Sequence, residues 1–426
     1  MRYLIFSLLL LIFTVSFSQD NKNDTIYLLK PDRVFDGEEM HEGWQVLIQK
    51  NKIINAGNFK SPSNAIVINL KGCTLLPGLI EGHSHLFLHP YNETPWNDQV
   101  LKESRAERTA RATIHANKTL LAGFTTVRDL GTEGAWYDDA GLKQAIEKGV
   151  IPGPRMIVAT RAIVASGTYG PRELNNDIES PRGAAEADGM DALVKEVRTQ
   201  IGKGADVIKV YADYYWGPGK IAYPTFTLSE LQRVVEVAGS SGRYVVAHAT
   251  EEEGMKRAAM AGVHTIEHGD GGTLEIFKLM KEKNIAYCPT LAASYSVAQY
   301  RGWKKGSAEP EMIQQKRKSF SAALQSSVTI CMGGDVGVFA HGQNALEMEL
   351  MNEYGMNAID VLRSATSVNA DVFQINNKVG RIRPELLADI LVVQGDPSKK
   401  INDIRNVKLV MKDGTIYINK FKGLDK

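Results

Sequence analysis

Cysteine is scarce in this chain, with only Cys73, Cys288 and Cys331 among 426 residues. A small, odd number of cysteines argues against a disulfide framework, even in an exported protein. Cys288 and Cys331 lie in apolar runs that are typical of buried strands. We therefore expect core thiols rather than a disulfide or a nucleophile.

Net charge is also nearly absent, at +1 for the whole chain. Binding to nucleic acid or to an anionic membrane favours a strongly basic surface, so neither is expected as the main partner. Long low-complexity tracts and solenoid-type repeats are missing as well. The length is sufficient for one large domain and a smaller one.

The one long apolar run stands at the N-terminus. Met1 and Arg2 give a positive start, residues 3–15 are almost entirely apolar, and Ser16 to Ser18 place small residues where a signal peptidase cleaves. This order is typical of a secretory signal peptide. A membrane anchor is the alternative, but a bilayer span needs about 20 apolar residues. We expect cleavage near Ser18/Gln19 and an exported protein, either periplasmic or secreted.

The two ends of the chain are rich in predicted strands. Alternating apolar and polar residues indicate short strands at 25–30, 45–50, 52–56 and 65–68, and again at 388–393, 408–412 and 415–418. Asp413-Gly414 is typical of a hairpin turn. The pattern predicts one small β-sandwich domain built from residues 19–76 and 385–426, after a signal peptide at 1–18.

The middle of the chain, residues 77–384, alternates strands with helices. Strands are expected at 124–130, 155–160, 206–212, 244–248, 265–267, 285–288 and 328–332, each preceded by a helical segment. With the apolar run before His83, this makes eight βα units. Eight such units in one chain predict an α/β fold, a closed parallel (β/α)8 barrel of the TIM type.

Ionisable side chains end or interrupt several of these apolar strands. The set comprises His83 and His85 after the first strand, Lys209 within the fourth, His248 and His268 after the fifth and sixth, and Asp335 after the eighth. His83 and His85 face the same side of an extended chain. The carboxyl ends of barrel strands share one mouth. Nitrogen ligands with a carboxylate suit zinc, manganese, iron or cobalt, so the set predicts a catalytic metal site.

This set, with His-x-His on the first strand and a lysine on the fourth, resembles the amidohydrolase superfamily. Further matching stretches are LPGLI (76–80), GFTTVRD (123–129), IEHG (266–269) and ATSVNA (365–370), followed by GRI (380–382), ADI (388–390) and GDP (395–397). The match covers essentially the whole chain after the signal segment. Within the superfamily, the chain resembles the imidazolonepropionase-like branch, which includes metal-dependent Xaa-Pro-type dipeptidases.

The resemblance implies a two-metal centre, with zinc expected and manganese, iron or cobalt as alternatives. His83 and His85 would hold one metal with Asp335, while His248 and His268 would hold the other. Lys209, as a carbamate formed with carbon dioxide, would bridge them. A hydroxide between the metals would then cleave the C–N bond of a dipeptide or an N-acyl amino acid. Asp335 would be the catalytic general base and then acid.

Lys209 also supports the carbamate on physical grounds. Residues 207–211 are apolar on both faces of the strand, as expected for a barrel strand covered by helices. A buried lysine loses its proton more easily than an exposed one. The neutral amine can capture carbon dioxide and become an anion with two oxygens.

Four further side chains are predicted to contact the substrate at the mouth: Tyr211, Arg128, Tyr169 and His341. Tyr211 lies two residues after Lys209 on the same strand face and is equally well explained as a pocket wall. Arg128 ends the second strand. The alternative to a substrate contact is that Arg128 forms a structural ion pair with Asp129. Tyr169 stands where many of the dipeptidases that this chain resembles carry a histidine. The alternative for His341 is that it lies in a loop and does not contact the substrate.

Two other functions stay open at this point. His248 and Glu251 have the His-x-x-Glu spacing of single-metal deaminases and cyclic-amidine hydrolases, with Glu251 as proton shuttle. Glu251 also opens an acidic first helical turn, where carboxylates favour the helix dipole. A non-catalytic barrel is disfavoured, because such an inward cluster without a metal costs stability. The expected partner is a small amide or peptide, and a homo-oligomer stays open.

Overall fold

The computed structural model describes residues 25–172, 174–175, 177–219 and 221–421. The predicted signal peptide, residues 1–18, lies outside this part of the chain. Within the described residues, no helix combines the length and apolar character that a bilayer crossing requires.

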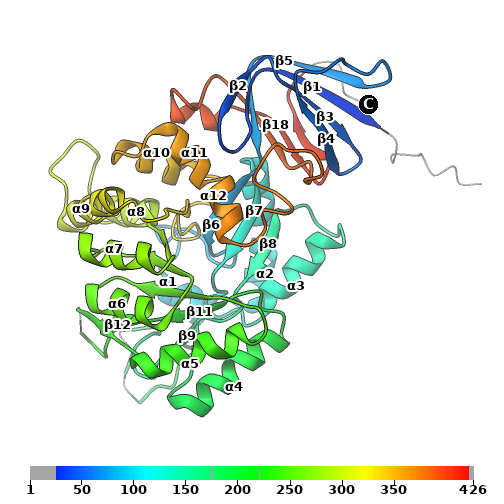
Figure 1. Ribbon diagram of the computed structural model, residues 1–426. Helices are drawn as coiled ribbons and strands as arrows, with labels where there is room; N and C mark the ends of the chain where they lie inside the picture. Colours follow the sequence, from blue (N-terminus) through cyan, green and yellow to red (C-terminus); the bar gives the residue numbers. More distant parts are fainter. Residues whose placement is uncertain (1–24, 173, 176, 220, 422–426) are drawn as a thin grey trace, which may run out of the picture.

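Strands from the two ends of the chain share one sheet (Figure 1). Its strands are β1 (Ile26–Phe35), β2 (Met40–Glu42), β3 (Gln45–Gln49), β4 (Lys52–Gly57), β5 (Ile66–Pro77), β17 (Ile390–Gln394), β18 (Val407–Lys412) and β19 (Thr415–Asn419). The order is β19-β18-β17-β5-β1-β3-β4, with β2 paired to β1. Antiparallel pairing of β5 with β17 sets Leu75 opposite Val392 and joins the two ends.

Strand β1 is longer than the sequence pattern indicates. The sequence pattern ends this strand at Lys30, yet β1 continues to Phe35. The pairing of β1 with β5 shifts register between Pro31 and Arg33. Such an irregularity tolerates a proline, which has no N–H to donate to the ladder.

The middle of the chain contains parallel strands, in two sheets ordered β6-β7-β8 and β10-β9-β11-β14-β15-β16. The strands are β6 (Leu79–Ser84), β7 (Phe124–Asp129), β8 (Arg155–Val158), β9 (Ile163–Val164), β10 (Ala185–Glu186), β11 (Ile208–Tyr211), β14 (Val245–Ala249), β15 (Thr265–His268) and β16 (Ala286–Cys288). A short hairpin follows β11 and consists of β12 (Asp213–Tyr215) and β13 (Ala222–Pro224). Every residue of β6, β7 and β11 is buried, as expected for parallel strands with both faces covered.

Helices lie between and after these strands (Figure 1). They are α1 (Trp96–Lys102), α2 (Arg105–Leu121), α3 (Asp138–Glu147), α4 (Gly189–Gly202), α5 (Leu228–Gly239), α6 (Glu252–Ala261), α7 (Leu274–Glu282), α8 (Leu291–Tyr300), α9 (Glu311–Ser326), α10 (Ala345–Glu353), α11 (Ala358–Ser364), α12 (Ser367–Val372) and a 3-10 turn at Ile401–Arg405. Local sequence sets several of their ends. A capping box of Thr227 and Glu230 starts α5, and Gly262, in the left-handed conformation, ends α6.

The eighth strand expected at residues 328–332 is not a regular strand in the structure. Its pairing is limited to single bridges, between Ile330 and Tyr287 and between Val336 and Ser84. Gly333 follows this segment and is closely packed, because a Cβ there would lie 2.4 Å from the Cys288 sulfur and 2.8 Å from the His83 backbone nitrogen. This close approach brings the following residues against β6.

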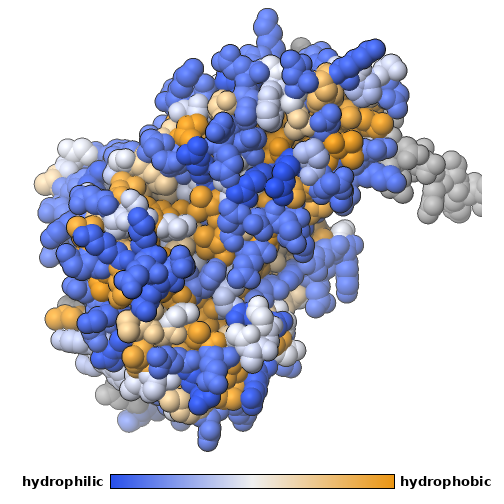
Figure 2. Space-filling view, in the orientation of Figure 1, coloured by the Kyte–Doolittle hydropathy of each residue, from blue (hydrophilic) through white to orange (hydrophobic). Residues whose placement is uncertain are grey.

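Apolar side chains fill the interior, and the three cysteines are buried and free. The face in Figure 2 is mostly hydrophilic, with apolar residues exposed in small groups between the elements. This is the usual surface of a folded protein.

Candidate active site

The six residues predicted to bind metal come together at the carboxyl ends of neighbouring strands. His83 lies in β6 with His85 directly after it, Lys209 lies in β11, His248 in β14, His268 ends β15, and Asp335 follows the bridge at Ile330. The His83 ring centroid is 5.3 Å from that of His85 and 5.0 Å from that of His268. His248 and His268 are 4.4 Å apart by the same measure. Ligand atoms of His83, His85 and Asp335 all lie within 4.8 Å of one another.

Hydrogen bonds fix the orientation of three of these rings. Nδ1 of His83 bonds a carboxylate oxygen of Glu267 at 2.9 Å, and Nδ1 of His85 bonds the Gly131 carbonyl at 2.8 Å. Nδ1 of His268 bonds the Thr290 hydroxyl at 2.9 Å. With Nδ1 engaged in each ring, Nε2 is left for a metal. Partners of this kind orient metal-binding histidines in general.

Two buried polar atoms at the site have no hydrogen-bond partner among the described residues. They are Nζ of Lys209, whose residue is 1% exposed, and Nδ1 of His248. Leaving a buried polar group unpaired costs about 1–3 kcal/mol. Metal coordination at His248 and conversion of the lysine to an anionic bridging ligand would remove both deficits. The residues present therefore fit a metal centre.

Burial shifts the pKa values of the side chains that are predicted to bind metal. It lowers the pKa of His83 to about 4 and the pKa values of His248 and His268 well below the ordinary value, so these rings are neutral. A neutral imidazole has the lone pair that a metal requires. Burial also lowers the pKa of Lys209 to about 8, against the opposing charges of Glu267 and Asp335.

Asp335 remains charged despite its burial. Burial alone would raise its pKa, but His83 and His85 hold the pKa of Asp335 below the ordinary value. Its Oδ1 lies 3.3 Å from Nε2 of His85 and 3.6 Å from Nε2 of His83. Burial disfavours the charged form of His85, yet Asp335 raises the pKa of this ring to about 9. A bound cation would take the place of that proton beside the carboxylate.

Two of the candidate ligands have strained backbones. His268 has φ of +74° and Asp335 has φ of +61°. Residues other than glycine rarely adopt this left-handed region, and such strain concentrates at active and ligand-binding sites. The backbone therefore supports a functional role for this end of the strands.

The structure places Arg128 in the core rather than at the mouth. The residue is fully buried, and its guanidinium donates to Glu267 at 2.9 Å and to the Gly82 carbonyl at 2.7 Å. Its ion-pair partner is Glu267, whereas the sequence suggested Asp129. Burial at this depth gives no access to a substrate carboxylate. Arg128 instead supports Glu267, which orients His83.

Tyr211 and Tyr169 form a wall beside the candidate metal site, whereas His341 packs elsewhere. The Tyr211 ring stacks on His248 with centroids 4.3 Å apart. Tyr169 lies 4.8 Å from Tyr211, centroid to centroid, and its hydroxyl donates to the buried carboxylate of Glu133. His341 stacks on His115 of α2 and bonds the Leu88 carbonyl at 3.0 Å, which is a packing role.

Sequence reasoning assigned no role to three buried carboxylates around the site. Glu267 orients His83, and Glu81 accepts from the backbone N–H groups of His83 at 3.1 Å and Gly334 at 2.8 Å. Both acids stand in apolar strands one or two residues before a histidine, which was a usable signal. Glu133 bonds Trp96 and Tyr169 from distant segments, so the local sequence carries no signal for it.

Glu251, the proton shuttle of the single-metal alternative, occupies the N-cap of α6. Its backbone N–H donates to Asp213 at 2.8 Å. Among the described residues, the clusters of possible metal ligands do not include it. Its position agrees with the alternative given above, in which Glu251 opens an acidic first turn of a helix.

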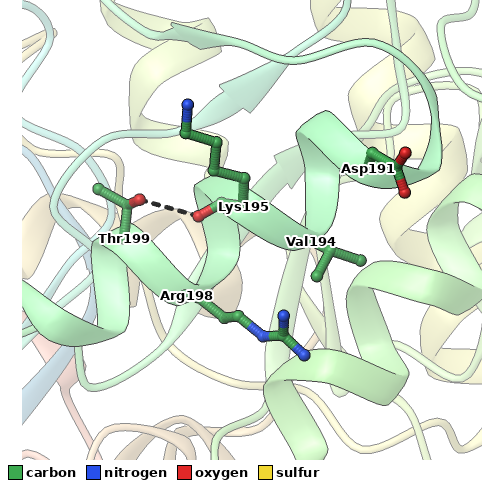
Figure 3. Close-up of a pocket in the computed structure, with 5 residues that line it drawn as sticks. All are labelled: Asp191, Val194, Lys195, Arg198 and Thr199. Carbon is green, nitrogen blue, oxygen red and sulfur yellow. Dashed lines mark hydrogen bonds between the residues drawn. The ribbon is translucent and has the colours of Figure 1, made fainter.

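Two surface hollows differ in their relation to this site. A hollow of about 480 Å³ lies along α4 and is lined by Asp191, Val194, Lys195, Arg198 and Thr199 (Figure 3). All five belong to one helix, their charged members are exposed to solvent, and none is a candidate ligand. A cavity of about 700 Å³ is lined in part by Tyr169 and therefore adjoins the tyrosine wall.

Solved structures share this architecture. A Xaa-Pro dipeptidase solved with methionine in its active site is 31% identical, with a TM-score of 0.82 over 93% of this chain and all of that one. A prolidase in complex with N-methylphosphonate-L-proline is 26% identical, with a TM-score of 0.81 over the same shares. Both are similar to this chain in sequence as well as in fold.

Sequence comparison leads to the same group of proteins. Ochratoxinase from Aspergillus niger is 28% identical over 365 residues, which are 79% of this chain and 73% of the relative. The amidohydrolase family model matches residues 74–417. Members combine a TIM barrel with a β-sandwich, are typically metal-dependent and hydrolyse carbon–nitrogen bonds of small amides or peptides. The chain therefore belongs to the amidohydrolase family and is a hydrolase of carbon–nitrogen bonds.

Proposed function

We propose that this protein is a metal-dependent amidohydrolase that cleaves the amide bond of a dipeptide or an N-acyl amino acid. The observation that carries the proposal is the convergence of four histidines, Asp335 and Lys209 at one set of strand ends, with the lysine Nζ lacking a hydrogen-bond partner among the described residues. The methionine and the proline phosphonate in the two similar structures support a substrate of amino-acid size.

We also propose that the chain forms a closed (β/α)8 barrel and a small β-sandwich domain, the latter made from both ends of the chain. Bridges from Ile330 to Tyr287 and from Val336 to Ser84 support closure, because they connect β16 and β6 through the residues 330–336. A closed barrel gathers the strand ends around one mouth. This is the arrangement that the proposed chemistry requires.

Two divalent metals, zinc in the first instance, fit the donor set. His83, His85 and Asp335 would hold one, His248 and His268 the other, and carboxylated Lys209 would contact both. Metals bound by these residues would lower the pKa of a water molecule towards neutrality and would polarise the substrate carbonyl. The carboxylated lysine would also offset part of their positive charge.

The protein's own side chains position and move protons. Asp335 accepts the proton of the attacking water and returns it to the leaving nitrogen, which requires the charged form that its histidine neighbours favour. Glu267, the Gly131 carbonyl and Thr290 keep the imidazoles oriented. Tyr211 and Tyr169 wall the site on the His248 side.

Metal removal and reconstitution test this function. We expect close to two metals per chain, and hydrolysis of at least one member of a panel of dipeptides and N-acyl amino acids. Chelation should abolish this hydrolysis, because the water then returns to its ordinary pKa, and zinc or manganese should restore it. Metal content is measured by elemental analysis of the same samples that are assayed.

Two results would contradict the proposal. Fully metal-loaded protein that hydrolyses no amide in the panel would remove the assigned activity. One metal per chain together with deamination or opening of a cyclic amidine would favour the single-metal class, and Glu251 would become its candidate proton shuttle.

We also propose export, on the basis of the N-terminal charge, apolar run and small residues. Protein recovered from its native host is expected to begin at Gln19, because a signal peptidase removes residues 1–18. Intact-mass analysis measures this directly. A mass that includes Met1 to Ser18 would show that the segment is retained.

A further inference from the structure

Glu133 lies between a candidate metal ligand and the wall formed by Tyr169 and Tyr211. The residue is 3% exposed, and its Oε1 lies 3.9 Å from Nδ1 of His85. Its Oε2 accepts from Nε1 of Trp96 at 3.0 Å and from the Tyr169 hydroxyl. The backbone of Glu133 has φ of +51°, in the left-handed region where strain often accompanies function. The carboxylate therefore borders the candidate active site without being one of the predicted ligands.

The charge of this carboxylate has no basic partner in the part of the chain that the structure describes. Arg108 donates instead to the backbone carbonyls of Glu133 at 2.7 Å and Thr132 at 2.9 Å. Nδ1 of His85 already bonds the Gly131 carbonyl, and 3.9 Å is too long for a hydrogen bond to Oε1. Both hydrogen bonds to the Glu133 carboxylate reach Oε2. A buried carboxylate without a cation is costly, so Oε1 is the atom to which a cationic ligand would bind.

Gly131 keeps the space between this oxygen and the His85 ring free of a side chain. A Cβ at position 131 would lie 3.3 Å from Oε1 of Glu133 and 3.6 Å from Cε1 of His85. Gly131 also has φ of +151°, a conformation that glycine adopts at little cost. A small substrate group that enters beside His85 can therefore reach Oε1.

The other neighbours of the Glu133 carboxylate are aromatic. The Tyr169 ring lies 5.1 Å from the Trp96 ring and 4.8 Å from the Tyr211 ring, centroid to centroid. Aromatic rings exclude water, which strengthens a charge pair, and their faces attract cations. An ammonium group combines a positive charge with three N–H donors. These surroundings therefore fit an ammonium group.

We propose that Glu133 binds the ammonium group at the N-terminus of a dipeptide substrate. The inference rests on the proposed function, because it assumes amide hydrolysis at the strand ends. In a dipeptide the amine nitrogen lies about 2.5 Å from the scissile carbonyl carbon. A carbonyl that is attacked at the strand ends thus places this nitrogen close to His85 and Glu133. An N-acyl amino acid has no such cation, so Glu133 is a specificity residue that favours dipeptides.

The test compares the fastest dipeptide of the panel with its desamino analogue, in which hydrogen replaces the ammonium group. In the native protein, kcat/KM for the dipeptide should be about 10- to 100-fold higher, the range expected for hydrogen bonds between charged groups. Glu133→Gln should remove this advantage and leave the rate on the analogue within about twofold. Glutamine keeps an oxygen that can accept from Trp96 and Tyr169, so the structural hydrogen bonds are preserved. Elemental analysis should find the native metal content in this variant.

A binding measurement separates recognition from chemistry. Calorimetry with the metal-loaded protein should show that L-leucinamide binds about 10- to 100-fold more weakly to Glu133→Gln than to the native protein. Binding of 4-methylpentanamide, which lacks the amine, should not change.

Glu103→Gln is the matched control. Glu103 ends α1, its carboxylate is largely buried, and it accepts from Nε2 of His89 at 2.7 Å. It is not one of the candidate ligands. Its replacement removes a carboxylate charge of the same kind and should leave the preference for the dipeptide unchanged.

Four results would overturn the inference while leaving the proposed function in place. The first is native protein that hydrolyses the desamino analogue at least as fast as the dipeptide. The second is an equal loss on both substrates in Glu133→Gln, which would show a structural role. The third is an unchanged preference in that variant, and the fourth is the same selective loss in Glu103→Gln. If the native protein hydrolyses no amide in the panel, the failure lies with the proposed function instead.

Discussion

Lys209→Ala is expected to lower the metal content from about two per chain to one or fewer and to reduce hydrolysis by about 10³-fold. The native Nζ is buried and has no hydrogen-bond partner among the described residues. As a charged ammonium it would repel metals, whereas as a carbamate it would supply two anionic oxygens. Losing several kcal/mol of transition-state stabilisation by a metal corresponds to this decrease.

A carbamate on Lys209 can be detected directly by isotope labelling. Protein equilibrated with ¹³C-labelled carbon dioxide should show a carbamate carbon signal that Lys209→Ala lacks. Lys209→Glu should recover part of the activity, because it places a carboxylate on the same strand at a shorter reach. Metal content and rate should rise together in that variant.

Lys412 provides a matched control for removing a buried lysine. It lies in β18, is 7% exposed, and its pKa is lowered by burial, as for Lys209. Lys412→Ala should keep both metals and the native rate, whatever its effect on stability. Full activity in Lys209→Ala with one metal bound would refute the bridging role and make Glu251 the next residue to replace.

Asp335→Asn is expected to lower kcat by about 10²- to 10⁴-fold, the usual contribution of general acid–base catalysis. The carboxylate lies beside the imidazoles of His83 and His85 and is held in its charged form. An amide of nearly the same shape can still donate an oxygen to a metal, but it cannot carry the proton. The rate should therefore fall much further than the metal content.

Asp206→Asn is the corresponding control. Asp206 stands before β11, at the opposite end of the strand from the candidate site, and pairs with Lys143. Its replacement should leave kcat within about twofold of the native value. A near-native kcat in Asp335→Asn with metal bound would show that another group moves the proton.

The candidate ligands other than Lys209 could be chosen from sequence because each stands at the end of an apolar run or within three residues of it. His83, His248 and His268 follow such runs directly, and the rule that strand ends share one mouth then brings them together. The start of helix α5 can also be predicted from the local sequence, because Thr227 and Glu230 form a capping box. Signals of this kind lie within a few residues of the feature that they predict.

Other features depend on contacts between distant segments. Arg128 ends a strand, as a mouth residue would, but its partner Glu267 lies 139 residues away and draws it into the core. The eighth strand is reduced to single bridges, and the residue that follows it, Gly333, packs against His83 and Cys288. Neither contact leaves a trace in the local pattern.

Sequence by itself determined the alternation of strands and helices, the ends of several helices and the set of residues that can bind metal. These properties follow from the periodicity of buried positions and from capping, both of which act over short distances along the chain. Only the tertiary structure decided the roles of Glu267 and Glu133. Their hydrogen bonds are made with groups that folding alone brings near.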